Sequence, residues 1–81
     1  MTRCNYEVLR TLEKAITRYS ITVTHERKTE KEETRINCYL LAEACEEIIP
    51  QMLSNTELYH CTRERLTKKY ETIYNKRREN Y

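Results

Sequence analysis

Apolar side chains recur along the first third of the chain at alternating intervals of three and four residues. The series consists of Leu9, Leu12, Ile16, Tyr19 and Val23. This spacing is the a and d pattern of an α-helix that buries one narrow stripe against another helix. Suitable cap residues stand between Thr2 and Asn5. The pattern therefore predicts a first helix from this region to Val23.

A β-strand is the alternative for residues 20–24, where polar and β-branched side chains alternate. We favour the helix, because no other segment alternates well enough to pair with this one. An isolated strand would leave its backbone groups without hydrogen bonds.

The apolar pattern stops between His25 and Arg35, where charged residues follow one another and can pair at intervals of three and four. Either the first helix continues into solvent, or this stretch is a solvated face and a turn, which we favour. The chain reversal is predicted between Glu33 and Asn37, where Thr34 or Asn37 can cap the next helix.

A second helix is predicted from another apolar series with the same spacing. Its stripe is Cys38, Leu41, Cys45, Ile48 and Met52, widened by Leu40, Ala44 and Ile49. Pro50 falls inside this pattern, where it removes one backbone donor and clashes with the preceding turn. The helix must therefore end there or bend.

A third apolar series follows Pro50. Residues 54–57, Ser-Asn-Thr-Glu, fit a capping box in which Glu57 reaches back to Ser54. The apolar side of the helix that starts there is Tyr59, Leu66, Tyr70 and Ile73. Two arrangements stay open: a break between Pro50 and Ser54 with a third helix, or one long second helix kinked at Pro50.

Composition supports an all-α fold. The 81 residues include no Gly, Phe or Trp and one Pro, so most routes to tight hairpins and phosphate-binding loops are closed. Charged residues make up 35% of the chain, and the mean hydropathy is -0.93. We predict one domain, residues 1–81, folded as a small antiparallel helical bundle with a thin core.

The cysteines are expected to be reduced, because no secretory signal precedes them. They are Cys4, Cys38, Cys45 and Cys61. A zinc site would need His25, His60 and Cys61 with a further thiol, but no C-x2-C or H-x3-H pair occurs. We expect neither a metal nor a cofactor.

Catalysis is not expected either. Ser20 and Ser54 lie in no nucleophile motif, and the neighbours His60 and Cys61 cannot form a dyad in a regular helix. The carboxylate pairs Glu32-Glu33 and Glu46-Glu47 point about 100° apart on a helix, so we interpret them as solvated surface.

The C-terminal third is basic and carries several tyrosines. Its cations are Arg63, Arg65, Lys68, Lys69, Lys76, Arg77 and Arg78, interleaved with Tyr59, Tyr70, Tyr74 and Tyr81. Such a stripe can bind phosphates and stack on bases, or meet an acidic protein. We favour a third interpretation, in which most of these cations lie on a solvated face near the negative end of a helix dipole. The net charge of +2 and the pI of about 8.4 are too mild to indicate nucleic-acid binding by themselves.

No apolar run reaches the roughly 18 residues of a membrane span, so a cytosolic or nuclear protein is expected.

Two segments resemble the tubulin-binding cofactor A family. Residues 12–19 have its L-x-K-x4-Y spacing, followed by a Glu/Lys-rich extension, and residues 42–50 form an acidic amphipathic segment that ends in Ile-Pro. The resemblance covers under half of the chain. It implies an antiparallel helical bundle that holds β-tubulin on its folding route, in the cytoplasm and at the cytoskeleton, with no catalytic residue or cofactor.

Two other functions remain open. The chain can be a structural coiled-coil subunit whose apolar stripe completes a larger assembly, or a small helical domain that binds nucleic acid through its basic C-terminal third. Neither a membrane nor a small-molecule substrate is expected.

Overall fold

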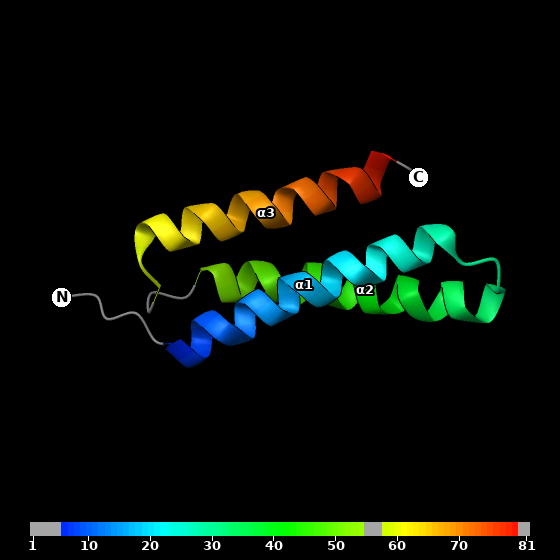
Figure 1. Ribbon diagram of the computed structural model, residues 1–81, viewed down its shortest axis with the longest axis horizontal. Helices are drawn as coiled ribbons and strands as arrows, with labels where there is room; N and C mark the ends of the chain where they lie inside the picture. Colours follow the sequence, from blue (N-terminus) through cyan, green and yellow to red (C-terminus); the bar gives the residue numbers. More distant parts are fainter. Residues whose placement is uncertain (1–5, 55–57, 80–81) are drawn as a thin grey trace.

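The computed structural model describes residues 6–54 and 58–79 and folds them into three antiparallel helices. These are α1 (Tyr6–Lys28), α2 (Glu32–Leu53) and α3 (His60–Glu79). They form an elongated body of 49 × 22 × 15 Å, in which α3 lies along one side of the α1–α2 pair (Figure 1). The predicted all-α bundle is confirmed in its three-helix form.

Helix α1 buries the predicted stripe. Leu12, Ile16 and Tyr19 have no exposed surface, and Val23 is almost as fully buried. The segment 20–24 is helical, so the strand alternative is wrong. The hydroxyl of Thr24 donates to the carbonyl of Ser20 at 2.9 Å, one turn earlier, as β-branched hydroxyl residues commonly do within helices. The expected start between Thr2 and Asn5 lies outside the described residues.

The chain reverses at residues 29–31, earlier than predicted. Lys31 is the N-cap of α2 and makes no capping hydrogen bond with its side chain, so Thr34 and Asn37 do not cap this helix. The first turn instead carries Glu32 and Glu33, whose charges favour a helix N-terminus. The charged stretch between His25 and Arg35 contains strong helix formers. Its first residues therefore belong to α1 and its last residues to α2.

Helix α2 buries only part of the predicted stripe: Cys38 and Ile49 are buried, and Cys45 and Met52 pack half-buried against the core. Its buried residues are Cys38, Ala42, Ile49 and Leu53. Leu41 and Ile48, predicted to be core, are 58% and 53% exposed. Apolar residues surround more than half of α2, so two neighbouring stripes satisfy the same spacing. The observed rotation brings Glu46 against α1 and α3, as described below, whereas a stripe centred on Leu41 would turn this carboxylate away.

Helix α2 continues through Pro50 for three more residues and ends at Leu53. Pro50 has no N–H to donate to the carbonyl of Glu46, four residues earlier. The hydroxyl of Tyr70, on α3, donates to this carbonyl at 3.5 Å. A tertiary hydrogen bond thus takes the place of the backbone bond that proline removes.

Helix α3 begins at His60, later than predicted. Ser54 caps the C-terminus of α2, and its hydroxyl donates to the carbonyl of Gln51 at 2.7 Å, so a helix does not start there. The remaining capping-box residues, 55–57, lie outside the described residues. Leu58 is buried ahead of the helix, and Leu66 and Tyr70 carry its apolar side into the core, as expected for the latter two.

The bond between Tyr70 and the Glu46 carbonyl can be tested with a double-mutant cycle. We expect Tyr70→Phe to lower the free energy of unfolding by about 1 kcal/mol in the wild type. In a Pro50→Ala background the new N–H satisfies the same carbonyl, so the loss should shrink by about half or more. Urea unfolding of the four proteins measures the coupling. An equal cost of Tyr70→Phe in both backgrounds would contradict the compensation.

Candidate functional site

The most buried cation among residues 6–54 and 58–79 joins all three helices. Arg77, on α3, is 1% exposed, although it lies among consecutive basic residues near the end of the helix. Its Nε and Nη2 atoms donate to Glu26 of α1 at 3.2 and 3.4 Å. Its Nη1 donates to Glu43 and Glu46 of α2 at 3.1 and 2.7 Å. The guanidinium therefore has carboxylate partners on both other helices, as a buried cation requires.

Glu46 is the centre of this arginine cluster. Its Oε2 also accepts a hydrogen bond from the hydroxyl of Tyr19 at 2.7 Å, and its Oε1 accepts one from Arg78. The Tyr19 and Tyr70 rings pack with centroids 5.4 Å apart. The guanidinium of Arg78 lies 5.1 Å from the ring centre of Tyr74, within cation–π range. Polar and aromatic contacts thus form one continuous layer between α3 and the α1–α2 pair.

The protonation equilibria of the cluster favour its present charge states. Burial, supported by the hydrogen bond to Glu46, raises the pKa of Tyr19, and burial raises the pKa of Tyr70 to about 12. Burial alone would lower the pKa of Arg77, but the hydrogen bonds to its carboxylates outweigh this effect and raise it. The phenols stay neutral and the guanidinium stays charged at physiological pH. The cluster therefore holds the three helices together at this pH.

Sequence reasoning missed this cluster. The sequence predicts Arg77 on a solvated face near the helix dipole and Glu46 in a solvated carboxylate pair, and both predictions are wrong. The signal was present, however. Glu26 continues the buried spacing of α1 three residues after Val23, and Arg77 follows Leu66, Tyr70 and Ile73 at intervals of four, three and four. A carboxylate and a guanidinium at core positions of two helices point to a buried ion pair.

A groove runs between α1 and α2 and has a volume of about 570 Å³. Its lining is largely apolar and comprises Thr11, Lys14, Ala15, Arg18, Ile21, Thr22, Leu41, Ala44, Cys45, Ile48 and Ile49. No residue of α3 lines it. Leu41 and Ile48, predicted to be core, are its most exposed large side chains on α2, while Lys14 and Arg18 stand on its α1 wall. We call this feature the α1–α2 groove.

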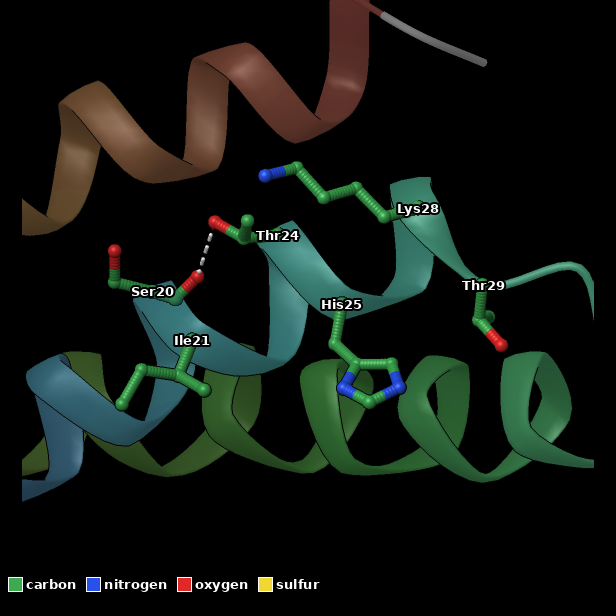
Figure 2. A pocket seen from close by; sticks show the side chains of 6 residues that line it. All are labelled: Ser20, Ile21, Thr24, His25, Lys28 and Thr29. Carbon is green, nitrogen blue, oxygen red and sulfur yellow. Dashed lines mark hydrogen bonds between the residues drawn. The ribbon is translucent and has the colours of Figure 1, made fainter.

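A second hollow, of about 480 Å³, lies on the outer surface of α1 (Figure 2). Its six lining residues all belong to α1 or follow it directly, so it has no opposing wall from another helix. Thr24 already donates to the carbonyl of Ser20, and the ammonium of Lys28 extends back over this turn (Figure 2). We assign no binding role to this surface.

The thiols are separate from one another. Cys38 is buried, Cys45 half-buried and Cys61 exposed, and all three are free. Burial raises the pKa of the Cys45 thiol, so this group is a poor nucleophile at neutral pH. Cys4 lies outside the described residues.

Residues 6–54 and 58–79 contain no group of three or more side chains arranged to hold a metal ion. His60 is a ligand only in the zinc arrangement that the sequence disfavours. Its Nε2 atom lies 3.0 Å from Oε1 of Glu64.

Within the described part of the chain, no helix has the length and apolarity needed to span a bilayer.

Comparisons with protein-family models, with curated proteins and with solved structures give no match to this chain.

Removing the cation of the arginine cluster should lower the stability of the fold strongly. Arg77→Met should strand the charges of Glu26 and Glu46 and destabilise the fold by about 3–5 kcal/mol, enough to abolish a cooperative thermal transition in a chain of this size. Circular dichroism melting provides the measurement. Arg65→Met, at an exposed site on the same helix, is the control and should change stability by less than about 0.5 kcal/mol. Adding Glu26→Gln to Arg77→Met should recover part of the lost stability. A melting temperature unchanged by Arg77→Met would contradict a stabilising role for the arginine cluster.

The raised pKa of Tyr70 predicts a loss of stability in alkali. The unfolded phenol ionises near pH 10, whereas the folded phenol stays neutral to about pH 12. Between pH 10 and 12 the unfolded chain releases this proton while the folded chain keeps it, so the free energy of unfolding falls by about 2–3 kcal/mol over this range. Urea unfolding between pH 9 and 12 should show a shallower decline for Tyr70→Phe than for the wild type. Tyr6→Phe, at a 76% exposed site, should keep the wild-type slope, and identical slopes for all three would contradict the assignment.

Proposed function

We propose that this chain is a non-catalytic chaperone that holds β-tubulin folding intermediates on the α1–α2 groove. The observation that carries the binding proposal is the exposure of Leu41 and Ile48 beside Ala44 on one side of α2. Contiguous apolar surface of this kind marks interaction sites in small soluble domains.

The groove can supply binding energy. Full burial of a Leu or Ile side chain is worth about 1.5–3 kcal/mol, so covering Leu41 and Ile48, each about half exposed, contributes a few kcal/mol before ordering costs. A groove open along two helices accepts an extended or helical segment without enclosing it. Such a surface suits a partly folded polypeptide better than a small molecule.

The resemblance to tubulin-binding cofactor A supports β-tubulin as the client. The two resembling segments, 12–19 and 42–50, lie on α1 and α2, the helices that form the groove walls. Residues from both segments line it, among them Ala15 and Ile48. A cytoplasmic location at the cytoskeleton follows from this proposal.

The nucleic-acid alternative receives less support. Arg77 is buried among carboxylates, and Arg78 pairs with Glu46, so the basic stripe of α3 offers fewer cations to phosphates than the sequence implies. Tyr70 is buried and Tyr74 packs against it, so of the described tyrosines on this stripe only Tyr59, 50% exposed, offers a ring to a base.

Client capture tests the proposal. Labelled β-tubulin released from a chaperonin is titrated with the wild type and with Ile48→Asp, which places a charge in the groove. We expect capture to fall at least tenfold, because an aspartate in a buried contact loses its hydration. Circular dichroism should show an intact fold, since Ile48 is 53% exposed.

Ile36→Asp is the matched control. Ile36 lies on the same helix and is 52% exposed, but it does not line the groove, so capture should match the wild type. Equal capture by the Ile48 and Ile36 variants would remove the groove from the proposal. Failure of the wild type to capture tubulin would overturn the proposal itself.

A further inference from the structure

The two walls of the α1–α2 groove differ in charge. Lys14 and Arg18 are exposed on the α1 wall, one helical turn apart, and none of the described lining residues is a carboxylate. The α2 wall is formed by apolar side chains alone. The ion pairs found among residues 6–54 and 58–79 involve neither cation. Both charges are therefore available to a bound partner.

The groove is shaped to receive apolar side chains between its walls. Ala15 of α1 and Cys45 of α2 are small, and both are partly buried where they pack against the core. Leu41 and Ile48 stand higher, with more than half of their surface exposed. Small residues at depth beside larger ones at the rim leave a hollow that side chains of a partner can enter.

We propose that the segment bound in this groove is an amphipathic α-helix with acidic residues along one edge of its apolar stripe. Its apolar side chains contact Leu41 and Ile48, and two of its carboxylates face Lys14 and Arg18. The inference rests on the proposed function, since it names the kind of client segment that the groove takes.

A helical occupant follows from the backbone hydrogen bonds that a bound segment needs. An extended segment binds well where it can pair with the edge of a sheet, and residues 6–54 and 58–79 contain no strand. Besides the two cations, the polar side chains among the described lining residues are Thr11 and Thr22. A helix satisfies its backbone groups internally, so an apolar lining does not leave them unpaired.

The spacing of the lining residues also fits a helix. On α1 they extend from Thr11 to Thr22, a rise of about 16 Å or three helical turns. Leu41 and Ile48 are seven residues apart, which matches the i, i+7 repeat of an apolar stripe. Carboxylates four residues apart on the bound helix are one turn apart, as the two cations of α1 are.

The cations of α1 determine the charge of the occupant. A bound helix brings its own flank close to Lys14 and Arg18 and removes part of their water. Carboxylates on that flank are attracted to both, whereas lysines there are repelled by both. Repulsion of this kind excludes basic helices as effectively as attraction selects acidic ones.

Peptide binding to the purified chain tests the inference. A fluorescein-labelled peptide of about four helical turns carries a leucine stripe with two glutamates, four residues apart, along one edge. A second peptide has lysine at those two positions, and a third has the composition of the first with its stripe scrambled. Fluorescence anisotropy should show the acidic peptide binding about tenfold more tightly than the basic one, a difference that shrinks in high salt.

The scrambled peptide should bind at least tenfold more weakly than the acidic one, and circular dichroism should show the acidic peptide gaining helix when bound. Equal affinity for the acidic and basic peptides would overturn the proposal. So would binding without a gain of helix. The affinity should be the same at two protein concentrations about tenfold apart. An affinity that falls as the protein concentration rises would place a second copy in the groove, and would also overturn the proposal.

Charge reversal on the protein places the acidic edge against α1. Lys14→Glu with Arg18→Glu should reverse the preference, so that the basic peptide binds more tightly than the acidic one. The matched control is Arg65→Glu with Lys69→Glu, which changes two exposed cations four residues apart on α3. It should keep the wild-type preference. The same preference in both double variants would overturn the assignment of the two α1 cations.

This experiment separates the inference from the proposed function, because it uses no tubulin. Ile48→Asp should weaken binding of the acidic peptide at least tenfold, and Ile36→Asp should leave it unchanged. A wild type that captures tubulin but does not prefer the acidic peptide overturns the inference alone. A wild type that prefers the acidic peptide but captures no tubulin overturns β-tubulin as the client and leaves the inference standing.

Discussion

The buried guanidinium of Arg77 determines how the three helices are placed. Its carboxylate partners come from α1 and α2, and they converge only when both helices have the observed rotation. Replacing such a cluster with apolar residues is often neutral for stability, whereas breaking it is costly, so we infer that its main effect here is to select one arrangement of the helices. In a chain without Phe or Trp and with a thin core, hydrophobic packing alone leaves several helix rotations close in energy.

The α1–α2 groove is a consequence of this rotation of the helices. Turning Glu46 toward Tyr19 and Arg77 brings Ala42 and Ile49 into the core and leaves Leu41 and Ile48 on the surface. Helix α3 covers the side where the charges meet, and no helix of the described chain covers the other (Figure 1). The exposed apolar side chains are therefore coupled to the polar layer on the opposite side of α2.

The sequence predicts the elements better than their rotation. The stripe of α1 is narrow and flanked by polar residues, so its 3,4 spacing identifies the buried side chains through Val23. On α2 the apolar positions are too many for spacing to choose among them, and the choice depends on contacts with Glu46 that lie far away in sequence. Pro50 shows the same limit: local rules predict a kink or an end at this residue, but they cannot predict that the hydroxyl of Tyr70, on α3, donates to the Glu46 carbonyl that Pro50 leaves without a backbone donor.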